Sequence, residues 1–189
     1  MDILFLPRRR LQVTRTIPKT GPDGQTAMHR AAATGDVHTL RELLGRGYDT
    51  RIENRWGKTP LQVAFSWKKE AAAEVLVEAD TQVDLQDEDG MFPLHSAARN
   101  GFVRVMEKLI AAGAGTRVKD RKEKTPLHWA LSSEKEIAAE LLVNADSEVC
   151  SLDSDGCAPL HLAAMHGYVG VARKLLSAGA NIDRHSMSI

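Results

Sequence analysis

Apolar residues occur along this chain in short groups with helical spacing. Leu127, Ala130 and Leu131 are three and four residues apart, which places their side chains on one face of a helix. Val171 and Leu175 belong to a second group with the same spacing, further along the chain. The pattern predicts pairs of short amphipathic helices, each with an apolar side that has to be buried.

The paired pattern returns every 33 residues. A dipeptide suited to the start of a helix begins at positions 26, 59, 92, 125 and 158. Threonine can cap a helix at the first position, and proline loses no hydrogen bond at the second. Leucine recurs at one offset further on, at Leu43, Leu76, Leu109, Leu142 and Leu175. A period of this length predicts stacked repeats, because one pair of short helices cannot bury both of its apolar sides alone.

Glycines punctuate the repeated unit at two places. One set separates the two helices, at Gly35, Gly101 and Gly167, and another ends the second helix, at Gly47, Gly113 and Gly179. A left-handed helix cap is expected at the second set. Three kinds of departure occur: Lys68 and Glu134 stand between helices, Glu123 replaces a turn glycine, and Asp80 and Asp146 replace the terminal one. Aspartate tolerates left-handed backbone better than most residues, so we expect that conformation at Asp80 and Asp146.

The start of the first helix carries a recognisable motif. Residues 125–130 read TPLHWA, and the other copies read TAMHRA, TPLQVA, FPLHSA and APLHLA. With its 33-residue period, the chain resembles the ankyrin repeat family from residue 21 to about 185. The resemblance implies an all-α ankyrin-repeat solenoid of helix-turn-helix units joined by β-hairpin-like turns. We expect a basic N-terminal arm at 1–20, partly extended or disordered, a C-terminal stub at 186–189, and five repeats between them: 21–53, 54–86, 87–119, 120–152 and 153–185.

Composition narrows the classes of partner and compartment. Lys and Arg total 25, as do Asp and Glu, and this neutral balance argues against nucleic acid as the main partner. No apolar run approaches the length that spans a bilayer, so we expect no membrane insertion. Two cysteines are too few for a disulfide scaffold, which favours a reducing, cytoplasmic location. The N-terminal arm has two interpretations. It packs over the first repeat, or its three consecutive arginines, Arg8, Arg9 and Arg10, form a nuclear-import signal.

Histidine is the residue that most invites a catalytic or metal-binding interpretation. Four histidines recur with the period, and the resemblance implies that their rings form hydrogen bonds within and between hairpins: His29, His95, His128 and His161. No catalytic, phosphate-binding or metal-binding motif occurs. We therefore expect no enzymatic activity, no cofactor, no metal and no small-molecule substrate. Cys150 and Cys157 flank one turn, where reduced thiols are favoured over a redox bridge.

The resemblance also implies a protein partner on a concave face made of turn tips and the ends of the first helices. Trp56 and Trp67 fall there, and tryptophan is enriched in binding hot spots, although either ring could instead fill a gap between hairpins. Trp129 lies inside a helix, where packing is favoured. Tip charges are basic, acidic and basic in copies two to four, which suggests a partner of complementary pattern. The candidate contacts are Arg55, Trp56, Lys58, Trp67, Glu88, Asp89, Met91, Arg99, Asn100, Arg121, Lys122, Lys124, Met165 and His166.

These patterns favour a non-catalytic scaffold that binds another protein, whose identity they leave open. The alternative is a recognition fragment of a larger regulatory or catalytic protein whose activity lies elsewhere. Self-association is a further alternative, because the fifth repeat lacks an obvious polar outer side. Its second helix carries Val171, Leu175 and Leu176.

Overall fold

The computed structural model describes residues 21, 23–80, 83–145 and 149–181. The predicted arm at 1–20, Asp146 and the stub at 186–189 lie outside the described residues. Over the described ranges the chain forms ten helices and no strand, and none of these helices is long and apolar enough to cross a membrane. The helices are α1 (Ala27–Thr34), α2 (Val37–Gly45), α3 (Pro60–Ser66), α4 (Glu70–Ala79), α5 (Pro93–Asn100), α6 (Val103–Ala111), α7 (Pro126–Ser132), α8 (Glu136–Asn144), α9 (Pro159–Met165) and α10 (Val169–Ser177).

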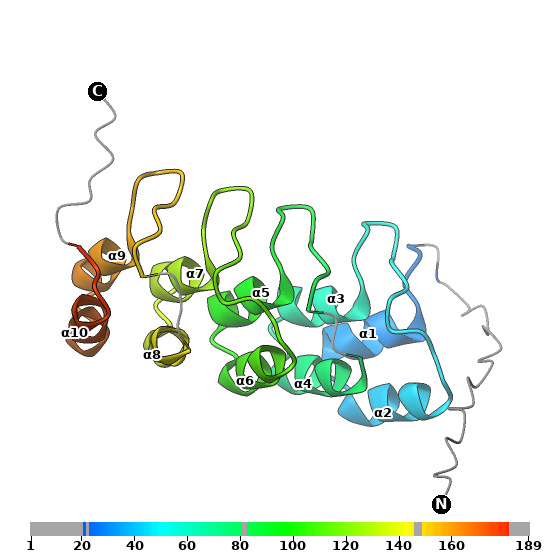
Figure 1. Cartoon of the computed structure of the whole chain (residues 1–189). Coiled ribbons are helices and arrows are strands. Elements are labelled where there is room, and N and C mark those ends of the chain that lie inside the picture. The colour runs from blue at the N-terminus through cyan, green and yellow to red at the C-terminus, as the bar shows by residue number, and fades with distance from the viewer. Residues whose placement is uncertain (1–20, 22, 81–82, 146–148, 182–189) are drawn as a thin grey trace, which may run out of the picture.

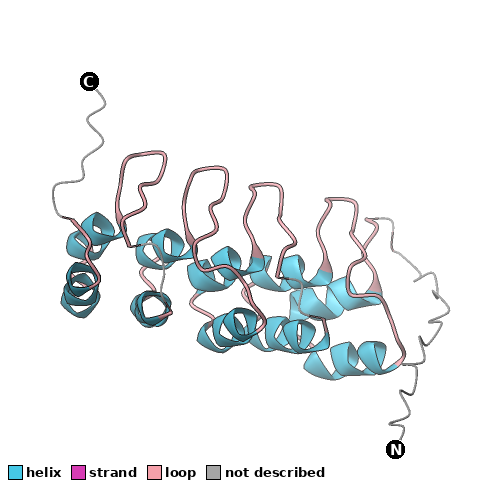
Figure 2. Ribbon diagram, viewed as in Figure 1, coloured by secondary structure: helices cyan, strands magenta, loops and turns pink. Residues whose placement is uncertain are grey.

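The helices form two layers of an elongated stack (Figure 1). The odd-numbered helices α1 to α9 follow one another in the layer beside the long loops, and the even-numbered helices α2 to α10 form the other layer. Each helix contacts its partner in the pair and its neighbours in the same layer. The loops between pairs project from the same side of the stack (Figure 2). The all-α solenoid predicted from the sequence is therefore confirmed.

Helices α3 and α7 begin where the threonine–proline signal predicts. Thr59 and Thr125 have extended backbone, and each side-chain oxygen accepts a hydrogen bond from the backbone N–H three residues on. Proline follows at the first helical position, where an N–H would have no partner inside the helix. In these two helices the motif thus acts locally, by fixing the first residue of the helix.

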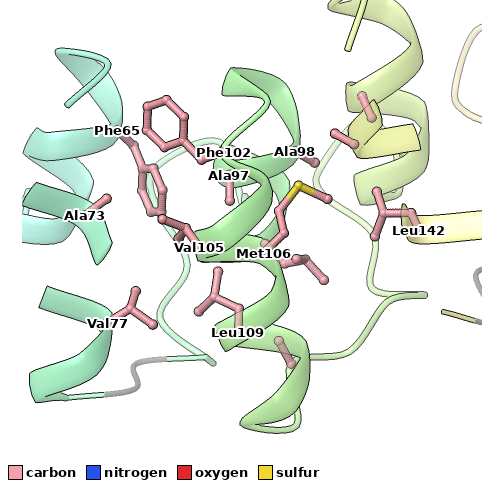
Figure 3. Close-up of a cluster of buried hydrophobic side chains, with 14 of the residues drawn as sticks. Phe65, Ala73, Val77, Ala97, Ala98, Phe102, Val105, Met106, Leu109 and Leu142 are labelled. Carbon is pink, nitrogen blue, oxygen red and sulfur yellow. The ribbon is translucent and has the colours of Figure 1, made fainter. Parts of the chain in front are cut away.

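The core lies between the layers and between successive pairs. Val105, Met106 and Leu109 of α6 are fully buried and lie between α4 and α8 (Figure 3). Phe65 and Phe102 stack with ring centroids 6.2 Å apart and join neighbouring pairs. Burying one such side chain stabilises the fold by about 1.5–3 kcal/mol. The stack is therefore held together by contacts that every pair shares with the next.

Residues other than glycine occupy several glycine positions at the helix ends and in the turns. Lys68, Glu123 and Glu134 have φ values of 54°, 56° and 58°, so these side chains occupy left-handed backbone at glycine positions. The prediction for Asp80 is wrong, because its φ is −154° and its backbone is extended. Its carboxylate instead accepts hydrogen bonds from Arg51 Nε at 2.8 Å and Thr50 Oγ1 at 2.9 Å. These contacts to the preceding loop account for an aspartate at this position without a left-handed cap.

Candidate binding groove

The projecting loops are built on a side chain that recurs with the repeat period. In four loops a side-chain oxygen accepts hydrogen bonds from the backbone N–H groups of the residues two and four positions later. The accepting residues are Asn54, Asp87, Asp120 and Asp153. The N–H of each of these residues also donates to the carbonyl four residues on, at 3.0–3.1 Å. Each tip is thereby a rigid turn, which fixes the directions of the side chains around it.

The recurring histidines connect each helix to the next loop. The Thr125 backbone N–H donates to Nδ1 of His128 at 3.2 Å, and Nε2 of His128 lies 3.1 Å from the Cys157 carbonyl oxygen. A carbonyl can only accept, so the Nε2 atom carries the proton and the ring is neutral. The same pattern occurs at His29 and His95, and burial lowers the pKa of all three imidazoles. The predicted structural role is confirmed for these three rings.

Two neighbouring hollows lie between the loops and the layer of odd-numbered helices. One, of about 440 Å³, is lined by two tryptophans with Val63 beside them, and we call it the Trp hollow: Gln25, Asn54, Trp56, Lys58, Val63, Ser66, Trp67 and Glu88. The side chains of Trp56 and Trp67 are 44% and 65% exposed, although tryptophan is normally well buried. Val63 is buried beneath this aromatic surface. The two tryptophan rings therefore present apolar surface to solvent and do not fill a gap in the core.

The adjoining hollow, of about 310 Å³, is richer in charge, and we call it the charged hollow. Its cations are Lys58, Lys68 and Arg99, and its carboxylates are Asp87 and Asp89. Its remaining lining residues are Gln62, Phe65, Ser66, Met91, Ser96 and Asn100. Lys58 and Ser66 line both hollows, so the two form one groove across α3 and α5.

Trp129 extends the aromatic surface along the stack. The Arg99 guanidinium lies 5.1 Å from the centre of the Trp129 ring, and Lys124 Nζ lies 5.5 Å from it. The indole Nε1 donates a hydrogen bond to Oδ2 of buried Asp120 at 2.8 Å. The expected packing role thus holds only in part: the ring is half-buried, and these polar and charged contacts were not apparent from the sequence.

The predicted contact residues divide by exposure. Nine are exposed: Arg55, Trp56, Trp67, Glu88, Asp89, Arg99, Arg121, Lys122 and Met165. Four are half-buried: Lys58, Asn100, Lys124 and His166. The prediction of an accessible Met91 is wrong, because its side chain is 3% exposed. Its backbone N–H donates to the Asp87 carboxylate, and its apolar side chain lines the charged hollow among residues that include Phe65.

Three half-buried members of the set have structural contacts. Asn100 donates through Nδ2 to the Phe65 carbonyl at 3.1 Å, which joins α5 to the preceding repeat. Lys124 Nζ lies 3.6 Å from Oδ2 of Asp153, in the next loop. His166 stacks on Tyr168 with ring centroids 5.7 Å apart. Their substitution is expected to affect folding as well as binding.

The side chains of Asp87 and Cys150 have hydrogen-bond partners. Across residues 21, 23–80, 83–145 and 149–181, no three His, Cys, Asp or Glu side chains gather as a metal site. The carboxylate of Asp87 accepts backbone N–H groups within its own turn. Cys150 and Cys157 are thiols in this structure, and Cys150 Sγ donates to the Gly179 carbonyl at 3.5 Å. The groove is thus equipped for contact through apolar surface, charge and hydrogen bonds.

Comparison with known proteins places this geometry in a family. A protein-family sequence model described as "Ankyrin repeats (3 copies)" matches residues 9–87, 78–153 and 94–186. The chain is 30% identical over 162 residues to the chicken (Gallus gallus) nuclear factor NF-kappa-B p105 subunit, and the match covers 83% of this chain and 16% of that protein. Mouse (Mus musculus) Rabankyrin-5 is 30% identical over 179 residues, and the match covers 86% of this chain and 15% of that protein. Mouse inversin is 30% identical over 175 residues, and the match covers 91% of this chain and 16% of that protein.

The chain spans about one sixth of the length of these relatives. The repeats that it shares with them generally serve protein–protein interaction and are typically non-catalytic. The matched residues extend over nearly the whole chain and include the loops and helices that form the groove. The chain belongs to the ankyrin repeat family.

Proposed function

We propose that this protein is a non-catalytic interaction module that binds a protein partner in the groove between its loops and its first helices. The observation that carries the proposal is the exposure of Trp56 and Trp67 in one hollow. Their rings do not belong to the buried core, and tryptophan is enriched among residues whose loss weakens interfaces by about 2 kcal/mol or more. A stable complex of this kind buries about 800 Å² on each partner.

The charges around the groove support selection among partners. Arg55 lies over the Trp56 ring with its guanidinium carbon 4.4 Å from the ring centre. The next tip carries exposed Glu88 and Asp89, and the following tip carries exposed Arg121 and Lys122. Charge complementarity mainly sets the register and the association rate of a complex. A partner with the inverse order of charges would dock in one orientation.

Affinity capture from cell extract tests the proposal when the wild-type chain is compared with a Trp56→Ala/Trp67→Ala double variant. We expect the double variant to lose the captured protein and to keep the wild-type unfolding free energy within about 0.5 kcal/mol. Ile137→Ala is the matched control, because Ile137 is 70% exposed and lies outside the groove. Equal capture by all three proteins would contradict the proposal, and an unfolded double variant would show that the rings serve packing.

A second candidate role follows from the relatives, which are about six times as long as the matched region. We propose as the alternative that the repeats are the recognition segment of a larger regulatory or catalytic protein. Sequencing the full-length transcript tests this alternative. A reading frame that continues into a further domain would support it, and a stop codon after Ile189 with no upstream extension would contradict it.

A further inference from the structure

We infer that the groove binds a linear peptide segment of its partner in which a bulky apolar side chain stands close to an aspartate or glutamate. The inference rests on the proposed function and adds the chemistry of the bound segment. The apolar side chain occupies the Trp hollow, and the carboxylate occupies the charged hollow.

The apolar half of the inference follows from the walls of the Trp hollow. Trp56 comes from a loop tip and Trp67 from the end of α3, with Val63 between the loop and that helix end in the sequence. Both rings are wetted in the free chain, and covering apolar surface releases that water. A leucine, phenylalanine or similar side chain of the partner gains more from this contact than a small or polar one.

The acidic half follows from cations that lack an acidic partner. Among the described residues, no carboxylate oxygen lies within 4.0 Å of the charged nitrogens of Lys58, Lys68 or Arg99. The layer of even-numbered helices differs, because Arg104 NH2 lies 3.0 Å from Glu74 Oε1 and Lys108 contacts the same carboxylate. With three cations against the carboxylates of Asp87 and Asp89, the charged hollow has an excess of one positive charge, which a carboxylate of the partner can neutralise.

The two hollows share a wall, which favours one continuous segment. Lys58 Nζ lies 3.3 Å from Ser66 Oγ, and both residues line both hollows. An extended chain advances about 3.3–3.6 Å per residue, so neighbouring peptide residues can reach the two hollows together. Glu88 in the Trp hollow and Asp89 in the charged hollow would repel a uniform polyanion, so the groove favours a peptide of mixed character over nucleic acid.

Peptide selection on the full chain tests the inference. Random twelve-residue peptides displayed on phage are selected on the wild-type protein, and the enriched sequences are synthesised with a fluorescent label for anisotropy titration. We expect enriched peptides to share a large apolar residue close to Asp or Glu. Replacing that acid with its amide should weaken binding about tenfold, which corresponds to about 1.4 kcal/mol.

Two protein variants show whether the acid meets the predicted cations. Arg99→Glu should weaken the selected peptides about tenfold and favour their Lys-substituted forms. Arg173→Glu is the control, because Arg173 is exposed on α10 and outside both hollows. Lys68→Gly should also weaken binding, and since Lys68 has left-handed backbone the loss would not come from unfolding.

The outcomes separate the inference from the proposed function. Enriched peptides without acidic residues, or with equal affinity for wild type and Arg99→Glu, would overturn the inference. Failure to enrich any peptide would also overturn it, by indicating that the partner presents a folded surface. In both cases the proposed function stands if partner capture still requires Trp56 and Trp67.

Discussion

Trp129 and Asp120 are joined by a hydrogen bond of 2.8 Å from the indole Nε1 to carboxylate Oδ2. The other oxygen of Asp120 accepts the backbone N–H groups of Lys122 and Lys124. One buried carboxylate thus ties helix α7 to the turn that precedes it. The Trp129 ring, which this bond orients, also lies against Arg99. Trp129 therefore connects the groove to the loop that Asp120 stabilises.

Trp129→Phe should lower the unfolding free energy by about 1–3 kcal/mol, because it leaves a buried Asp120 oxygen without its donor. Urea unfolding followed by circular dichroism measures the change. Trp67→Phe is the control, since Trp67 is 65% exposed and should change stability by less than about 0.5 kcal/mol. Equal stability of the two variants would show that the Trp129–Asp120 bond contributes little.

Stability should fall as the pH drops below about 6.5, the pKa of an unfolded histidine. Burial lowers the pKa of His29, His95 and His128 in the folded chain. Between the two pKa values the unfolded chain binds more protons, so the histidine contribution is complete above pH 6.5 and is lost at lower pH. Urea midpoints measured from pH 8 to pH 5 test this sign, and a stability that rises on acidification through this window would contradict it.

The second repeat supplies a control for the histidine effect. Gln62 occupies the histidine position there, and its Oε1 accepts the Thr59 backbone N–H at 2.9 Å. His95→Gln should therefore fold and should show a shallower pH dependence between pH 6.5 and pH 5 than wild type. Identical slopes for His95→Gln and wild type would assign the pH dependence to other groups.

Glycine exchange at the left-handed positions should change stability in opposite directions. Lys68→Gly should raise the unfolding free energy by about 0.5–1 kcal/mol, because it relieves a side chain held at φ 54°. Gly167→Ala, at φ 72° with no atom near the added methyl group, should lower it by about 1–2 kcal/mol. Thermal unfolding of both variants tests the pair, and shifts of the same sign would contradict the conformational explanation.

Leucine-to-alanine substitutions should lower the unfolding free energy more in the core between repeats than at the surface. Leu127 is fully buried, so Leu127→Ala should cost about 2–5 kcal/mol. Leu176 is 44% exposed, and Leu176→Ala should cost about 1 kcal/mol or less. Urea unfolding gives both values. Similar losses at the two sites would mean that Leu176 is covered in solution, as the predicted self-association requires.

The sequence predicted the fold because the repeat imposes the same local signals many times. Threonine caps, proline at the first helical position and leucines at a constant offset each agree with one helix pair. The backbone conformation of Asp80 was predicted wrongly, because the prediction considered only the tolerance of aspartate for left-handed backbone. Its partners, Arg51 and Thr50, lie 29 and 30 residues away in sequence, and no local rule includes them.

The groove was predictable in location but not in detail. The repeat positions indicated Trp56, Trp67 and Arg99, all of which are exposed. Met91 was misplaced because its position in the repeat alone does not show that its side chain is buried. The asparagine and the three aspartates that build the turns were missed as well. Their spacing of 33 residues, at Asn54, Asp87, Asp120 and Asp153, was the signal that could have identified them.

Oxidative footprinting of the complex tests the central claim most directly. All three tryptophans of the chain are at least partly exposed, and two line the Trp hollow, so hydroxyl-radical oxidation followed by mass spectrometry reports on this face. With the captured partner bound, we expect lower oxidation at Trp56 and Trp67 and unchanged oxidation at Ile137. Protection of Ile137 with both tryptophans still fully oxidised would place the partner elsewhere and contradict the account.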